Sequence, residues 1–196
     1  MFDEIELGIE FFEGLLAVDE AIVTQAATEA CRFCGGPLHR GDYPRKPRGG
    51  VLGLCGEAFR RRFSLCCGRE GCRRRATPPS VRFLGRRVYL GAVVIVASVV
   101  ATAVRTARAI REATGVPART TRRWLRWWRG PFTTTSAFVE MSARLVPVVQ
   151  RRRLPASLLE RLAGEPTRSV EKLLAWLTPL TTASSPEGSR FVRGLM

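Results

Sequence analysis

The sequence of 196 residues contains no asparagine, only two glutamines and two lysines, and a single histidine, His39. Histidine is the side chain whose ordinary pKa best suits acid–base catalysis near neutral pH. One histidine in a segment rich in Gly and Pro gives an active site little to use. The chain also lacks a P-loop, a GxGxxG motif and a Ser–His–Asp set. These absences predict a protein that is not an enzyme.

Basic charge is abundant and unevenly distributed. Thirty of the 32 basic residues are arginine, and the formal net charge is +15. Residues 1–30 carry a net charge of −8, residues 31–130 of +19 and residues 131–196 of +4. A block this basic favours a polyanionic partner, either nucleic acid or an anionic membrane surface. Arginine rather than lysine also suits contacts to phosphate.

The N-terminus and the cysteines indicate the compartment. The chain begins MFDEIELGIE, which is acidic, whereas a secretory signal begins with a positively charged segment. We therefore expect a cytoplasmic, nucleoid-associated protein. In a reducing compartment, the clustering of the six cysteines favours a metal site over disulfides.

Two groups of cysteines predict one structural zinc site. Cys31 and Cys34 form a C-x2-C motif followed by two glycines, and a second group contains Cys66, Cys67 and Cys72. Four thiolates brought together form the tetrahedral sulfur site that Zn²⁺ prefers. Because four thiolates fill the coordination shell, the ion would be structural rather than catalytic. The predicted ligands are Cys31, Cys34, Cys67 and Cys72.

The choice between Cys66 and Cys67 depends on strand alternation. In a strand over residues 63–67, Cys67 shares a face with Phe63 and Leu65, whereas Cys66 points to the other face. We therefore prefer Cys67 as the third ligand, and Cys66 remains the alternative.

Other readings of this region stay open. His39 could replace one thiolate as a ligand, although a single histidine in a loop is more often solvated. Cys55 has no partner at the required spacing and is predicted to be a small buried residue. Free or redox-active thiols are the alternative to a zinc site.

Residues 5–30 show apolar side chains at helical spacing, with acidic residues on the other faces. Gly14 and Asp19 predict a break into two short helices, with Asp19 as the N-cap of the second. Further along, short strands are predicted around residues 63–67 and 80–84.

Residues 88–104 contain no charged residue over 17 positions. A membrane-spanning helix needs about 20 apolar residues. A single span here would place basic segments on both sides of a bilayer, against the positive-inside tendency. Small residues such as Gly91 and Ser98 also suit a helix packed closely by others. We predict a buried helix, with a membrane-anchored cationic protein as the alternative.

Residues 107–128 have the layout of a helix-turn-helix. A short helix ends at Gly115, and a second helix begins near Pro117. The second helix has an apolar stripe made of Thr121, Trp124, Leu125 and Trp128. Its opposite stripe is the predicted DNA-binding face and contains Arg119, Arg122, Arg123 and Arg126. A solvated basic surface is the alternative reading of these arginines.

The predicted fold is mainly α with a small zinc-ribbon-like β module. After that module, a helix-turn-helix is followed by a small helical C-terminal region. Three C-terminal helices are expected over residues 136–146, 155–163 and 167–178, for packing or pairing. The predicted domains are an acidic helical segment, a zinc-ribbon-like module, the helix-turn-helix, the C-terminal helices and a disordered tail. They cover residues 1–30, 31–87, 88–130, 131–178 and 179–196.

The order of these elements resembles the DNA-binding front end of bacterial insertion-sequence transposases and their companion proteins. The resemblance covers roughly residues 31–130. It depends on Cys31-x-x-Cys34-Gly-Gly, Arg62-Phe63, Cys72-Arg-Arg-Arg and the segment from Gly115 to Leu125. In that family the zinc ribbon and helix-turn-helix bind transposon-end DNA. The resemblance implies the same four zinc ligands, and it implies groove reading by Arg119, Arg122, Arg123 and Arg126.

We therefore expect a non-catalytic, zinc-stabilised DNA-binding protein, associated with a transposon through recognition of element ends or through regulation. Its expected partners are double-stranded DNA and, through the C-terminal helices, a transposase or a second copy of the chain. No small-molecule substrate is expected. The alternatives are the membrane-anchored cationic protein and a zinc-ribbon module that binds RNA or a protein machine.

Overall fold

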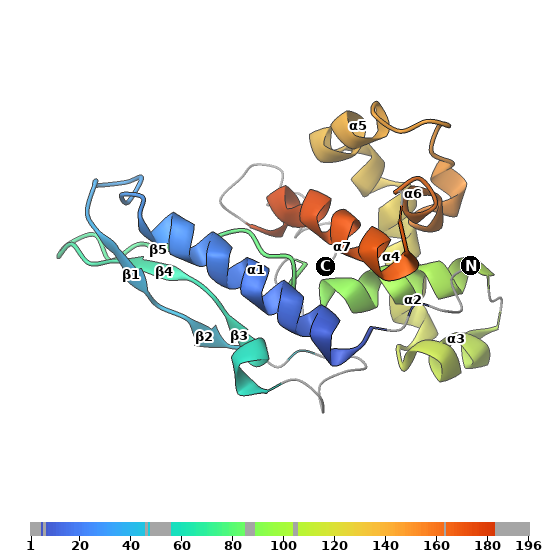
Figure 1. Ribbon diagram of the computed structural model, residues 1–196, viewed down its shortest axis with the longest axis horizontal. Coiled ribbons are helices and arrows are strands. Elements are labelled where there is room, and N and C mark those ends of the chain that lie inside the picture. The colour runs from blue at the N-terminus through green and yellow to red at the C-terminus, as the bar shows by residue number, and fades with distance from the viewer. Residues whose placement is uncertain are drawn as a thin grey trace.

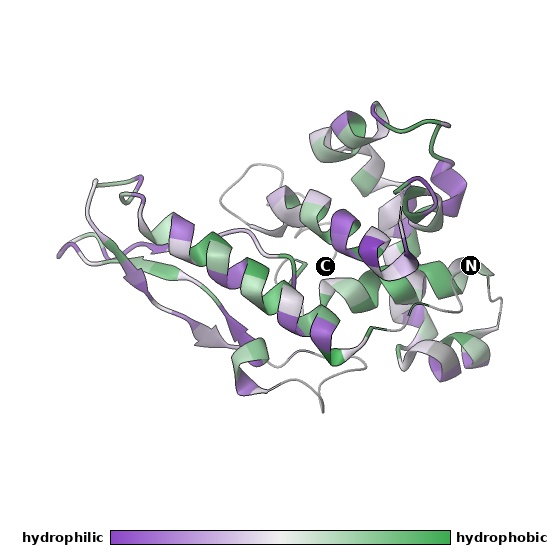
Figure 2. Ribbon diagram, viewed as in Figure 1, coloured by the Kyte–Doolittle hydropathy of each residue, from purple (hydrophilic) through white to green (hydrophobic). Residues whose placement is uncertain are grey.

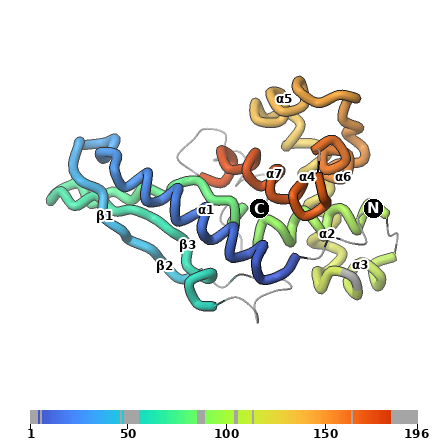
Figure 3. The backbone as a smooth tube through the Cα atoms, viewed as in Figure 1, coloured from blue at the N-terminus to red at the C-terminus, as the bar shows by residue number. Residues whose placement is uncertain are grey.

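A computed structural model describes residues 5, 7–45, 47, 56–84, 89–103, 106–162 and 164–182. The strands lie at one end of an elongated molecule and most helices lie at the other, with α1 running between the two ends (Figure 1). The chain follows α1 outward to the strands and then returns to α2 at the helical end (Figure 3).

Helices dominate the described chain, and two small antiparallel sheets complete it. The strands are β1 (Leu38–Arg40), β2 (Tyr43–Pro44), β3 (Arg61–Arg62), β4 (Leu65–Cys67) and β5 (Arg75–Ala76). The α-helices are α1 (Ile9–Ala27), α2 (Gly91–Ala103), α3 (Ala107–Thr114), α4 (Ala118–Arg129), α5 (Ser136–Ser142), α6 (Ala156–Leu159) and α7 (Pro166–Leu177). Short 3-10 helices are η1 (Glu57–Arg60), η2 (Pro131–Thr134), η3 (Arg151–Arg153) and η4 (Thr178–Thr181).

The N-terminal helix is continuous, so the predicted break near Gly14 and Asp19 is wrong. α1 extends over 19 residues and buries Phe11, Phe12 and Leu15 on one face. Asp19 does not cap a helix, because its carboxylate is buried inside the fold and bonded to groups from a distant segment.

A buried ion pair fixes α1 to the segment that precedes α2. Nε of Arg82 donates to a carboxylate oxygen of Asp19 at 2.8 Å, and the amide of Val81 donates to the other oxygen at 2.7 Å. The remaining guanidinium nitrogens of Arg82 donate to the carbonyls of Phe59 and Arg61 at 2.9 and 3.0 Å. The two charged side chains are 1% and 0% exposed, so this pair joins three parts of the chain without water.

The strands form two sheets, in the order β1–β4–β5 and β2–β3. Leu38 lies opposite Cys67 and Tyr43 lies opposite Arg62. Of the predicted strand over residues 63–67, only Leu65–Cys67 is found, as β4. The predicted strand over residues 80–84 is not found, because the side chains of Asp19 and Ser80 accept hydrogen bonds from backbone amides of that segment.

One main hydrophobic core extends from α1 to α7. Figure 2 shows the hydrophobic residues along α1 and α2 on the ribbon. At its N-terminal side, the rings of Phe12 and Phe59 meet edge to face, 5.5 Å apart. α2 is buried along most of its length and contacts α3, α4, α6 and α7. The predicted buried helix is therefore confirmed. None of the described helices is long and apolar enough to cross a membrane.

The three predicted C-terminal helices are present as α5, α6 and α7. α5 and α6 are shorter than predicted, whereas α7 has the predicted length and begins one residue earlier. Part of the expected disordered tail is ordered. Leu180 is buried, and the hydroxyl of Thr182 donates to the carbonyl of Thr77 at 2.7 Å. These contacts hold residues 179–182 against the core, and residues 183–196 lie outside the described part of the chain.

Replacing Asp19 by Ala is expected to destabilise the protein by about 3–5 kcal/mol, because it leaves the buried charge of Arg82 without a partner. The neighbouring Glu20 offers a matched control, since its ion pair with Arg40 is half exposed. Glu20→Ala should cost only about 0–1 kcal/mol. Urea unfolding curves of both variants measure the difference, and equal losses would refute the structural role given to Asp19.

Candidate metal centre and basic helix face

The first cysteine pair lies in a tight turn between α1 and β1. The amides of Cys34 and Gly35 donate to the carbonyl of Cys31, at 3.2 and 2.7 Å, and the amide of Cys31 donates to the carbonyl of Gly36 at 2.8 Å. Gly35 has a φ of +69°, which favours glycine. The turn therefore directs both sulfurs to the same side of the chain.

Gly36 is required for space rather than for backbone conformation. A Cβ at this position would lie 3.1 Å from Sγ of Cys67, 3.4 Å from Sγ of Cys34 and 2.9 Å from Cβ of Arg69. A side chain here would therefore push the two cysteine pairs apart. This gives a physical reason for the second glycine of the Cys31-x-x-Cys34-Gly-Gly motif.

The second cysteine pair closes a turn after β4. The amide of Arg69 donates to Sγ of Cys67 at 3.4 Å, and the amide of Cys72 donates to the carbonyl of Arg69 at 3.1 Å. The guanidinium of Arg69 donates to the carbonyl of Cys34 at 2.7 Å, which ties this turn to the first.

The structure brings the four predicted ligands together. The sulfurs of Cys31, Cys34, Cys67 and Cys72 all lie within 4.8 Å of one another. The Sγ–Sγ distances are 3.9 Å for Cys31 and Cys72 and 3.4 Å for Cys34 and Cys67. Zn–S bonds of about 2.3 Å in a tetrahedron place the sulfurs about 3.8 Å apart. The cluster therefore has the donor type, number and spacing of a zinc site.

The pKa values of Cys34 and Cys67 are shifted by their surroundings, which bears on how the cluster would bind a cation. A backbone hydrogen bond from Gly36 lowers the pKa of Cys34 to about 7, whereas burial raises the pKa of Cys67 to about 12. Four thiolates at this place need a compensating positive charge, which a zinc ion would supply while protons are released. Protons compete for the same sulfurs, so zinc binding should weaken as the pH falls.

Cys66 and His39 lie beside the cluster but are not part of it. The two residues face each other in the β1–β4 pair, and Sγ of Cys66 lies 3.4 Å from the carbonyl of Arg73. The alternation used to choose Cys67 is thus found in the structure, where Cys67 is buried and Cys66 is half-buried. Cys55, predicted to be buried, lies outside the described residues.

The 32 residues between Cys34 and Cys67 include folded structure. The strand β1 pairs with β4 beside the cysteines, and β2 pairs with β3 further away. Because these pairings bring the ends of the long connection back together, the sequence separation of the two cysteine pairs is compatible with their contact.

A second candidate site lies on α4, which follows α3 after a short turn. Gly115 caps the C-terminal end of α3, as predicted, and its φ of +66° is the left-handed conformation that favours glycine. Pro117 lies just before the first helical residue of α4, as its N-cap. α2, α3 and α4 contact one another, so the turn is held by a common core.

The inner face of α4 is anchored by tryptophans. Trp124, Trp127 and Trp128 are 1%, 2% and 0% exposed, and Nε1 of Trp128 donates to the hydroxyl of Ser98 on α2 at 3.2 Å. Trp127 was not part of the predicted apolar stripe. The centroid of its ring lies 4.9 Å from that of Phe132, which lies in η2, after the end of α4. The helical spacing within α4 therefore could not predict this contact.

The outer face of α4 carries four exposed arginines around a hollow of about 680 Å³. None of the four forms an ion pair with any residue in the described ranges. The side chain of Leu125 forms part of the same surface. We call this surface the α4 arginine face, and its members are Arg119, Arg122, Arg126 and Arg129.

Arg123 takes a different place from the other three arginines predicted for this face. It is half-buried, and its Nε is a buried atom without a hydrogen-bond partner among the described residues. Arg129, which was not predicted for this face, lines the hollow instead. One further helical turn of the arginine stripe would have identified Arg129, since it follows Arg126 by three residues.

Comparison with known proteins gives no further guide. No family model matches the chain, and no curated protein or solved structure resembles it significantly. The cysteine cluster and the α4 arginine face are therefore the features that bear on function.

Two neighbouring cysteines provide a test of the metal centre. Cys67→Ser is expected to abolish zinc binding and unfold the strand end of the protein, because structural zinc contributes on the order of 10 kcal/mol. Cys66→Ser should retain about one zinc per chain and the native fold. Metal analysis and thermal unfolding measure both effects. A folded wild-type protein without bound metal, or equal effects of the two changes, would contradict the assignment.

Proposed function

We propose that this chain is a non-catalytic, zinc-stabilised protein that binds double-stranded DNA through a helix-turn-helix formed by α3 and α4. The α4 arginine face would enter the major groove or lie against the phosphates. Zinc held by the four cysteines would stabilise the strand end of the fold. The resemblance noted in the sequence adds a role at transposon ends or in their regulation.

The observation that carries this proposal is the unpaired charge of the α4 arginine face. Four guanidiniums on one helix repel one another, and no acid within the described residues compensates them. The helix that presents them is held rigidly by three buried tryptophans. A polyanion removes the repulsion, and its condensed counterions are released on binding.

The helical form of the surface favours DNA over RNA. The major groove of B-form DNA admits an α-helix, whereas the major groove of duplex RNA is deep and too narrow for side chains to read. Arginine also forms bidentate hydrogen bonds with guanine edges and with phosphates. An exposed arginine helix on a rigid core therefore fits duplex DNA best.

The proposal is tested by removing two charges from the face. Arg122→Gln with Arg126→Gln is expected to weaken binding to a random duplex of about 30 base pairs roughly tenfold, because two phosphate contacts are lost. Fluorescence anisotropy at fixed salt measures the affinity. A duplex RNA of the same sequence should bind more weakly than the DNA.

The control removes two arginine charges that lie outside the α4 arginine face. Arg161 is half-exposed, Arg168 is exposed, and both lie in the C-terminal part of the chain, so Arg161→Gln with Arg168→Gln should leave DNA affinity close to that of the wild type. Equal losses in the two double variants would indicate only a general charge effect and would reject the α4 arginine face as the binding surface.

A further inference from the structure

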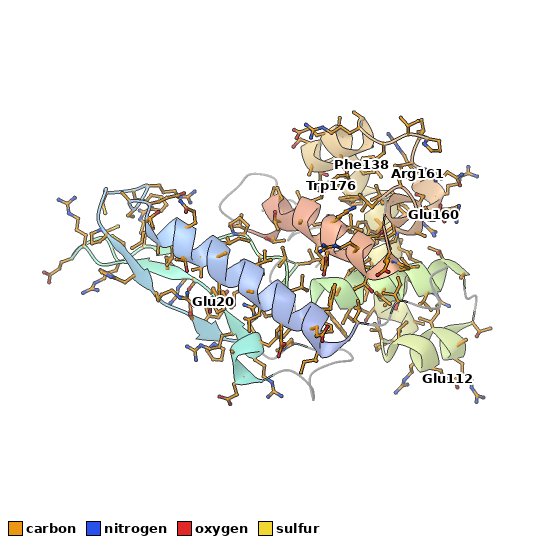
Figure 4. All side chains as sticks on the ribbon, viewed as in Figure 1. Glu20, Glu112, Phe138, Glu160, Arg161 and Trp176 are labelled. Atoms are coloured by element: carbon orange, nitrogen blue, oxygen red, sulfur yellow. The ribbon has the colours of Figure 1, made fainter. Side chains whose placement is uncertain are left out.

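A second surface, remote from the cysteines, combines exposed apolar side chains with unpaired charges. It is a groove of about 240 Å³ between α5 and α7. Ala137 and Met141 come from α5, and Ala175, Trp176 and Pro179 come from the α7 side. Figure 4 labels Trp176 beside Phe138, where α7 approaches α5. We call this surface the α5–α7 groove.

Trp176 distinguishes this groove from ordinary surface. It is 37% exposed, while the other three tryptophans of the chain are 2% exposed or less. Tryptophan is among the residues most enriched at the energetic centres of protein interfaces. A half-exposed tryptophan beside alanine and proline leaves apolar area in water that a partner surface would cover.

The charges beside the groove are complementary to each other. Glu140 and Arg144 both line it and are exposed, and neither forms an ion pair within the described part of the chain. Backbone hydrogen bonds from Ala143 to Val139 and from Arg144 to Met141 continue the last turn of α5. Arg144 therefore follows Glu140 by one helical turn, on the same side.

We propose that the α5–α7 groove is the interface between two copies of this chain, related by a two-fold axis. In such an interface residue i contacts residue j of the partner, and j contacts i. Antiparallel packing of the two α5 helices places Glu140 of each copy against Arg144 of the other. One surface thus supplies both charges, and the two Trp176 side chains are covered together.

The distribution of charge also favours a second copy at this end. Residues 31–130 carry a net charge of +19, whereas residues 131–196 carry only +4. Two copies of a chain with a net charge of +15 repel each other least where their C-terminal helices meet. This arrangement goes beyond the proposed DNA binding and does not depend on it.

Charge reversal tests the interface without DNA. Wild-type protein is expected to form a dimer of twice 21.7 kDa in analytical ultracentrifugation. Glu140→Arg and Arg144→Glu should each shift it to monomer, because each places like charges across the axis. The double reversal should restore the dimer. An equimolar mixture of the two single variants should also form dimers, since opposite charges then meet at both positions.

Controls separate the interface from folding and from general charge. Arg168→Glu reverses an exposed charge on α7, outside the lining of the groove, and should leave the dimer intact. Circular dichroism should show native helix content in every variant. Acrylamide quenching of tryptophan fluorescence should decrease as wild-type protein is concentrated, since Trp176 is the accessible tryptophan.

Three results would overturn the proposal. They are a wild-type protein that stays monomeric at all concentrations, single reversals that dimerise like the wild type, and a double reversal that remains monomeric. None of them bears on the α4 arginine face, so the dimer and the proposed DNA binding can fail separately.

Discussion

The buried pair of Asp19 and Arg82 is the interaction on which the arrangement of the molecule depends. It fixes the N-terminal helix to the segment that leads into α2, and the same guanidinium binds carbonyls beside β3. Two charges without access to water are stable only when both are present and fully hydrogen-bonded. α1 is therefore part of the fold rather than an appendage, and it connects the cysteine end to the helical end.

The two candidate sites are built in different ways because their surroundings differ. The strand end has short strands and only a small apolar cluster around Val23, Phe63 and Leu65, so a metal ion would supply cohesion that packing does not. The helical end has the main core, and three tryptophans hold α4 without a metal. α1, at about 1.5 Å per residue, separates the two ends by roughly 28 Å.

Patterns of neighbouring residues in the sequence predicted those features that depend on neighbouring residues alone. The cysteine spacing identified the four clustered thiols, strand alternation selected Cys67, and Gly115 marked the end of α3, because each depends on neighbouring residues. The unbroken α1 could not be predicted, since Asp19 is satisfied by Arg82, a residue far away in the chain. Two other features also depend on distant contacts and could not be predicted locally. They are the ordered structure of residues 179–182 and the half-burial of Arg123.

The central claim is that the α4 arginine face neutralises DNA phosphates, and the salt dependence of binding tests it most directly. The wild-type protein should be compared with a variant in which Arg119, Arg122, Arg126 and Arg129 are all replaced by Gln, using the same duplex over a range of salt concentrations. The slope of log K against log salt should be steeper for the wild type by about 3 to 4, close to 0.9 per phosphate contact. Equal slopes for the two proteins would contradict the claim.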